Sequence, residues 1–236
     1  MFQRFIPPVC TLFLLFPMGL LAGRSSSPPA ESHPVELPQP SLSGLTVEQA
    51  IQARRSIRRY GERPLSLEQL SQLTYAAQGI TGFSGNRPLR ATPSAGALYP
   101  IELYLAVHRV TDLDPGLYHY LPESHALERI RRGDLRDDLV SGCLGQSFVG
   151  RANVMFIMTA VFDRTTRRYG KRGERYIHME AGHISQNLYL QATSLGLGSV
   201  AVGAFRDEDL NHLLDLDSPE ETCLYLHAVG VPGTAE

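Results

Sequence analysis

The sequence predicts an α+β fold with a central mixed sheet flanked by helices. Two helical segments come first, and the strands that follow do not alternate strictly with helices. A doubly wound parallel sheet requires that alternation, so the order of elements favours α+β. A content of 43% hydrophobic and 19% charged residues is typical of a globular protein.

Capping boxes and apolar spacing predict the helices. Residues 46–55 begin with Thr46 and Gln49, and residues 66–79 begin with a second box of the same kind. The longest helix is predicted over residues 176–195, where apolar side chains recur at helical spacing. Weaker patterns predict further helices at 133–145 and 206–216.

Alternating and continuous apolar runs predict the strands. Residues 101–109 alternate apolar and polar side chains, whereas residues 153–161 are continuously apolar, as in a central strand buried on both faces. The remaining strands are predicted within 116–130, 199–205 and 223–232. Residues 79–96 are rich in glycine and proline and are predicted to be a long loop, and such loops are often functional.

The first residues predict a segment separate from the fold. Residues 1–23 have the pattern of a secretory signal peptide or membrane anchor, because the apolar run 5–23 follows Arg4. Residues 24–43 are rich in proline and serine and are predicted to be an unfolded linker, which leaves a domain over 45–236. A true signal predicts an exported or membrane-anchored protein on the periplasmic side, with membrane association through 5–23; otherwise the protein is expected to be cytoplasmic.

Charge and cysteine content argue against a nucleic-acid-binding protein and against a disulfide framework. A formal net charge of −2 argues against a nucleic-acid partner. Cys143 and Cys223 fit buried thiols better than a disulfide framework, although they could pair in an oxidising compartment.

Two motifs fail on their spacing. The glycines at 196, 198 and 203 lie between a helix and a strand, the reverse of a dinucleotide fingerprint. Glu180 and His183 form a single ExxH pair, which is insufficient for a di-iron site, so a surface or core histidine is the better interpretation and no metal is expected.

Residues 53–60, the arginine segment, hold four arginines. In an extended chain Arg54, Ser56 and Arg58 point the same way, and two guanidinium groups with a hydroxyl can bind a phosphate. The alternative is a charged helix end, since cations suit the C-terminus of a helix.

Residues 93–97, the motif loop, combine a proline with small side chains directly before the strand at 101–109. Small side chains let the backbone approach a flat ligand and offer it hydrogen bonds.

Four motifs together resemble the flavin-dependent nitroreductase superfamily, and in detail its SagB-type dehydrogenases and azoline oxidases. They are "RRSIRRY", "PSAGALYPIELY", "EAGHISQNLYLQATSLGLGS" and "VAVGAF", and the resemblance covers residues 45 to 232. It implies a nitroreductase-like fold, an intertwined homodimer and noncovalent FMN at the interface between the subunits.

The resemblance also assigns residues. It implies that the FMN phosphate is bound by Arg54, Ser56 and Arg58 with help from Arg55. It places the flavin ring or ribityl chain beside the motif loop, which is expected to come from the other subunit. It also places the ring beside the fourth motif, where a backbone N–H approaches N5. The residues implied in the motif loop are Pro93, Ser94, Ala95, Gly96 and Ala97, and those implied beside the ring in the fourth motif are Val202, Gly203 and Ala204.

Three departures from the family pattern bear on the reaction. Ala97 and Tyr99-Pro100 replace an Asn and a Gln-Pro-Trp of typical nitroreductases. Arg168 stands where azoline oxidases carry a lysine, and arginine cannot act as a base, which leaves Tyr169 as the candidate for proton transfer. No basic residue follows Arg206, where many relatives have one more.

The expected function is an FMN-dependent oxidoreductase that takes electrons from a donor such as NADH or NADPH and reduces an unknown acceptor. An exported domain would meet no nicotinamide pool, so either the N-terminal segment is no export signal or the donor differs. The substrate is a small molecule or a peptide. The alternatives are a non-enzymatic flavin-binding sensor or partner module, and a peptide-tailoring azoline dehydrogenase in a complex.

Overall fold

The computed structural model describes residues 33–216 and 220–233, which belong to a compact unit that begins at residue 32. The signal or anchor predicted over residues 1–23, and the first part of the linker, lie outside the described residues. Within the described residues, no helix combines the length and apolar character that crossing a membrane requires.

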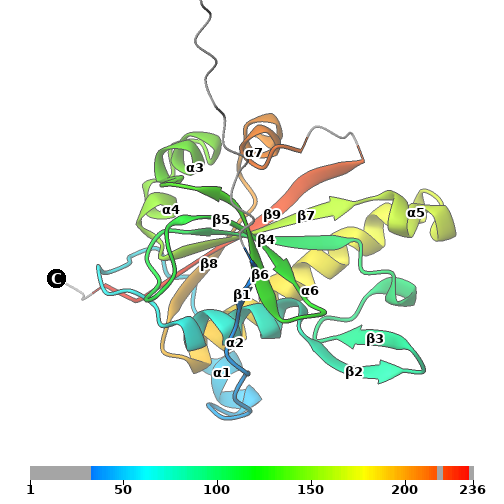
Figure 1. Ribbon diagram of the computed structural model, residues 1–236, viewed down its shortest axis with the longest axis horizontal. Helices are drawn as coiled ribbons and strands as arrows, with labels where there is room; N and C mark the ends of the chain where they lie inside the picture. Colours follow the sequence, from blue (N-terminus) through cyan, green and yellow to red (C-terminus); the bar gives the residue numbers. More distant parts are fainter. Residues whose placement is uncertain (1–32, 217–219, 234–236) are drawn as a thin grey trace, which may run out of the picture. The chain divides into compact units, whose positions relative to one another are not determined.

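The structure contains strands and helices in the order shown in Figure 1. The strands are β1 (Val35–Glu36), β2 (Ile80–Ser84), β3 (Arg87–Arg90), β4 (Ile101–Val107), β5 (Gly116–Leu121), β6 (Ala126–Arg132), β7 (Val154–Val161), β8 (Gly198–Val202) and β9 (Glu221–Gly230). The helices are α1 (Val47–Ala53), α2 (Leu67–Gln78), η1 (Ala95–Ala97, a 3₁₀ turn), α3 (Arg136–Gly142), α4 (Ser147–Arg151), α5 (Asp163–Tyr169), α6 (Arg172–Ser194) and α7 (Asp207–Leu213).

Seven strands form the central sheet in the order β1-β6-β5-β4-β7-β9-β8, and neighbouring strands in it run antiparallel. Among the described residues, parallel pairing is confined to isolated bridges, Ser56 to Ser199 and Leu65 to Val110. The mixed character predicted for the sheet is therefore limited to these bridges. The α+β class is confirmed.

Strand β7 divides the core into two layers, because its side chains alternate between the faces of the sheet. Phe156 and Met158 pack with α2 and α6 on one face, and Met155 and Ile157 pack with α3, α4 and α7 on the other. The continuous apolar run predicted a strand buried on both faces, and the structure confirms it. Figure 1 shows the two groups of helices on opposite sides of the sheet.

The linker prediction is wrong at its C-terminal end. Strand β1 pairs with β6, and Leu37 is buried behind it. The backbone N–H of Ser41 donates to the side chain of Gln72 in α2 at 2.7 Å. A two-residue strand among prolines leaves no periodicity to detect, so the fold begins before residue 45.

Two further expectations need correction. The loop predicted over 79–96 contains the hairpin β2–β3, whose turn uses Gly85 at φ +60°, a turn signal that the loop prediction overlooked. The long helix begins at Arg172, earlier than predicted, and is preceded by α5, which was not predicted. Both were missed because charged side chains over residues 163–175 hide the helical period.

Candidate functional site

The arginine segment leaves α1 and runs beside the edge strand β8. Ser56 forms a parallel bridge to Ser199, and the backbone N–H of Ile57 donates to the Ser199 carbonyl at 2.9 Å. The first motif is therefore anchored to the strand that leads into Val202, Gly203 and Ala204 of the fourth motif.

Tyr189 of α6 gathers two residues of the arginine segment. Its hydroxyl is hydrogen-bonded to the Ser56 hydroxyl at 3.0 Å and accepts the backbone N–H of Ala201 at 2.9 Å. The guanidinium of Arg54 lies 5.0 Å from the centre of its ring, a cation–π contact. Sequence reasoning missed Tyr189, although it lies within the quoted motif of the long helix.

The other arginines bear on whether this segment is a phosphate site or a charged helix end. Arg55 donates to the carbonyls of Gln52 and Arg54 at 2.9 and 2.8 Å, as an arginine closing a helix end does. Arg58 lies 5.7 Å above the ring of Phe148 in α4. Within residues 33–216 and 220–233, Arg54, Arg55 and Arg58 form no ion pair with a carboxylate, so their charge is available to an anion.

The fourth motif lies where β8 ends. Val202 is buried as the last residue of the strand, whereas Gly203 and Ala204 are exposed. The carbonyl of Ala204 accepts from the Gln146 side chain at 2.8 Å, which fixes the turn. A Cβ placed on Gly203 would approach only the ring of Tyr225, at 3.6 Å, so the backbone is open to a ligand.

The motif loop has an unusual backbone. Gly96, Ala97 and Tyr99 have φ of +66°, +51° and +46°, a left-handed region that non-glycine residues rarely adopt. The Ser94 hydroxyl accepts the backbone N–H of Tyr99 at 2.9 Å, and Tyr99 is buried beneath the guanidinium of Arg90. Strain of this kind concentrates at functional sites.

Arg168 and Tyr169 reach the motif loop in the same chain. A Cβ built on Gly96 would lie 2.8 Å from the Tyr169 hydroxyl and 2.9 Å from an Arg168 guanidinium nitrogen. The carbonyl of Gly96 also accepts from Arg87 of the hairpin at 3.3 Å. The candidate for proton transfer and the motif loop therefore form one cluster, and a side chain on Gly96 would require the ends of Tyr169 and Arg168 to shift.

Glu180 is a second residue that sequence reasoning missed. Its side chain is 2% exposed, and its Oε1 has no hydrogen-bond partner. Burial raises the pKa of this carboxyl to about 7, while a hydrogen bond from Ser94 and the charge of Arg90 act in the opposite direction. The detectable signal was its helical spacing from the buried Ile177 and Ile184, which puts a carboxyl on the core face.

A cavity of about 250 Å³ opens where the motif loop meets α6. Its lining residues are Pro93, Ser94, Ala95, Tyr176, Met179, Glu180 and His183. The two residues of the ExxH pair thus differ in burial, since Glu180 is buried behind the loop and His183 is exposed, although both line this cavity.

The structure places the two binding motifs at different points of α6. Ser56 contacts the helix at Tyr189, and Ser94 lies beside it at the cavity that Glu180 also lines. Nine residues of helix separate these contacts by roughly 13 Å along the axis. One chain therefore does not bring the arginine segment and the motif loop to the same point of this helix.

Comparison with known proteins identifies the family. The model of the nitroreductase family matches residues 51–231, which include the whole arginine segment, the motif loop and the fourth motif. The chain belongs to the nitroreductase family. The resemblance of the motifs is confirmed, and the chain is an oxidoreductase of a family that generally binds FMN.

Relatives within the family include one that matches almost end to end. A Methanocaldococcus jannaschii protein described as a nitroreductase is 42% identical over 196 residues, 83% of this chain and 96% of the relative. A crystal structure of a Ralstonia eutropha protein with the same description has a TM-score of 0.74 at 30% identity and covers 86% of this chain and 91% of that chain.

A third relative is the microcin B17-processing protein McbC of Escherichia coli. It is 31% identical over 148 residues, 58% of this chain and 54% of the relative. The chain thus matches about half the length of that protein. This similarity fits the azoline-oxidase-like subgroup that the motifs resemble.

The residues present fit FMN as a ligand. The guanidinium groups of Arg54 and Arg58, which form no ion pair within the described residues, suit a phosphate. Residues 203–204 are exposed and residues 95–97 are half-buried, and the small side chains of both segments let a flat ring approach the backbone. Aromatic side chains already hold both guanidinium groups in place.

Proposed function

We propose that this protein is an FMN-dependent oxidoreductase that passes electrons from a donor, NADH or NADPH, through flavin N5 to an acceptor. The observation that carries the proposal is the anchoring of the arginine segment on β8, directly before Val202, Gly203 and Ala204. A phosphate site and a ring site thereby share one strand.

The protein's contribution is binding, orientation and proton handling. Arg54, Ser56 and Arg58 bind the phosphate, and the backbone of residues 202–204 donates an N–H near N5. FMN supplies a ring that accepts and returns two electrons. Tyr169, whose hydroxyl lies against Gly96, holds a proton at Oη for the substrate.

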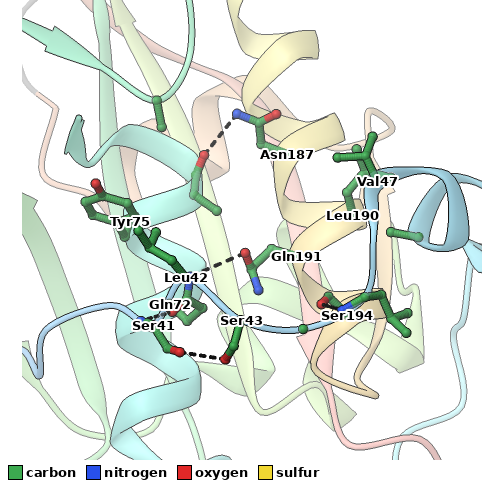
Figure 2. Close-up of a pocket in the computed structure, with 15 residues that line it drawn as sticks. Ser41, Leu42, Ser43, Val47, Gln72, Tyr75, Asn187, Leu190, Gln191 and Ser194 are labelled. Carbon is green, nitrogen blue, oxygen red and sulfur yellow. Dashed lines mark hydrogen bonds between the residues drawn. The ribbon is translucent and has the colours of Figure 1, made fainter. Parts of the chain in front are cut away.

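A homodimer completes this site, with the motif loop of one subunit beside the arginine segment of the other. Large apolar side chains are exposed in a short run that ends in α1, with Leu42 at 95%, Val47 at 63% and Ile51 at 58% exposure. Beside them, residues 41–45 border a cavity of about 530 Å³ between α2 and α6 (Figure 2). Exposed apolar surface of this kind suits a second copy of the chain.

FMN uptake by the full-length protein tests the proposal. We expect the purified protein to bind FMN and show its visible absorption, and we expect Arg54→Ala and Arg58→Ala each to weaken binding about tenfold or more. A hydrogen bond to a charged group contributes roughly 1.5–3 kcal/mol, which supports that size. Arg132→Ala in β6 is the matched control, because this exposed arginine lies outside the proposed site.

Addition of NADH or NADPH without oxygen then tests the reaction. Bleaching of the bound flavin supports an oxidoreductase with a nicotinamide donor. A protein that binds FMN but stays yellow with every donor supports the alternative of a flavin-binding sensor module. Failure of the wild-type protein to bind FMN overturns the proposed function, and the arginines revert to a charged helix end.

A second candidate is the dehydrogenation of a peptide azoline, favoured by the similarity to McbC and by the contact of Arg168 and Tyr169 with the motif loop. An arginine cannot supply the base, whereas a lysine can lose its proton. We expect Arg168→Lys to raise oxidation of an azoline peptide at least tenfold while FMN binding stays constant. Equal rates in both proteins would argue against this candidate.

A further inference from the structure

Glu180 is a buried carboxyl that the proposed function does not yet use. It lies on the core face of α6 between Ile177 and Ile184, directly behind the motif loop. A buried carboxyl with an oxygen lacking a partner is costly, so its presence here needs an explanation.

Ser94 connects this carboxyl to the site. A serine hydroxyl has one donor and two acceptor positions, and one acceptor position of Ser94 is taken by the backbone N–H of Tyr99. When Glu180 is ionised, the Ser94 hydroxyl, which lines the same cavity, can donate to it. When Glu180 is neutral, its O–H can donate to Ser94, which frees the serine proton to point elsewhere.

The cavity provides a route to solvent. His183 follows Glu180 by three residues, so both lie on the same side of α6, and its exposed imidazole lines the same cavity. The other groups near Glu180 are Arg90 of β3, whose charge favours the carboxylate, and Tyr176, one turn earlier on the helix.

We propose that Glu180 stores a proton behind the motif loop and delivers it to the site through the hydroxyl of Ser94. The acid gives its proton to Ser94 Oγ while Ser94 gives its own proton to the reacting ligand. One proton leaves, a carboxylate remains, and a solvent proton arriving past His183 restores the acid, with no electrons moved. Glu180 is thus a positioning and proton-storing residue, and its role rests on the proposed function because the ligand is that of the FMN site.

The first test needs no cofactor. The side-chain carboxyl carbon of Glu180 is followed by NMR against pH in the full-length protein, and is assigned as the signal missing from Glu180→Gln. We expect it to titrate near pH 7, in wild type and in the control Glu174→Gln, whose carboxyl is exposed on the same helix. Ser94→Ala should move the midpoint upward, because it removes a hydrogen bond that favours the carboxylate. Titration in the ordinary carboxyl range overturns the proposal.

Stability gives a second readout without FMN. The folded protein holds the Glu180 proton up to about pH 7, whereas the unfolded chain releases it near 4.5. The unfolding midpoint of wild type, relative to Glu180→Gln, should therefore fall as pH rises across this window. No change across this window contradicts the proposal.

The third test uses the FMN-loaded protein. We expect Glu180→Gln and Ser94→Ala to lower kcat about a hundredfold and to remove the same limb of the pH profile, as loss of a general acid does. Glu174→Gln should keep the wild-type profile. A wild-type profile in Glu180→Gln overturns the proposal, whereas a wild-type protein that binds no FMN overturns the proposed function and with it the delivery step, and leaves the stored proton to be judged by the titration.

Discussion

The arginine segment and the motif loop lie against the same helix, α6, but they differ in what they expose and in which side chain of the helix lies beneath them. The arginine segment presents exposed, charged side chains, and α6 supports it from outside through the hydroxyl and ring of Tyr189. The motif loop presents backbone and small side chains, and α6 supports it from within through a buried carboxyl, Glu180.

This difference separates two tasks. A phosphate is recognised by fixed charge, which can stay solvated until the ligand arrives, so the arginine segment needs only to be held in place. A reacting ring needs close approach of the backbone, which small residues such as those of the motif loop allow. It also needs a source of protons, which a titratable group beneath the loop can provide. Helix α6 thus connects a binding end, the proposed phosphate site at the arginine segment, with a chemical end, the proposed reaction site at the motif loop.

Among substitutions that would affect the chemical end and not the binding end, Gly96→Ala is expected to lower turnover the most. The new methyl group would displace the Tyr169 hydroxyl and Arg168, and misplacement of about 1 Å at such a site can lower turnover about a hundredfold. The left-handed backbone adds roughly 1 kcal/mol of lost stability. Turnover and thermal unfolding of the FMN-loaded protein measure both quantities.

Gly196→Ala is the matched control for that prediction. Gly196 has φ +68°, close to the +66° of Gly96, but a Cβ there would meet nothing within 4 Å. We expect the same loss of stability with near wild-type turnover. Equal turnover in the two variants would mean that the contacts at Gly96 have no catalytic role.

The parts of the site that the sequence could predict are those that lie in short continuous motifs. Arg54, Ser56 and Arg58 were predicted because alternation along an extended chain is a local property. Gly96 and Ala97 were predicted because small residues between prolines suggest close approach of the backbone; their positive φ angles are a separate feature that the structure adds.

The residues that the sequence did not predict depend on which helix face meets which loop. Glu180 was grouped with His183, since spacing alone does not show that one is buried and the other exposed. Tyr189 was counted among the residues of an amphipathic helix, and its contacts with Ser56 and Ala201 join chain segments far apart in sequence. Charged α5 and the proline-flanked β1 lack the apolar period on which prediction depends.

A smaller effect would sharpen the comparison at the binding end. Tyr189→Phe removes the hydroxyl that holds Ser56 and the Ala201 N–H but keeps the ring beneath Arg54. A lost hydrogen bond costs about 1 kcal/mol, so FMN should bind roughly fivefold more weakly while the pH profile of turnover stays unchanged. Tyr189→Leu should weaken binding further, because the cation–π contact is lost as well. Fluorescence titration of FMN measures both affinities, and tighter binding by Tyr189→Phe would show that the tyrosine competes with the phosphate for Ser56 and does not position it.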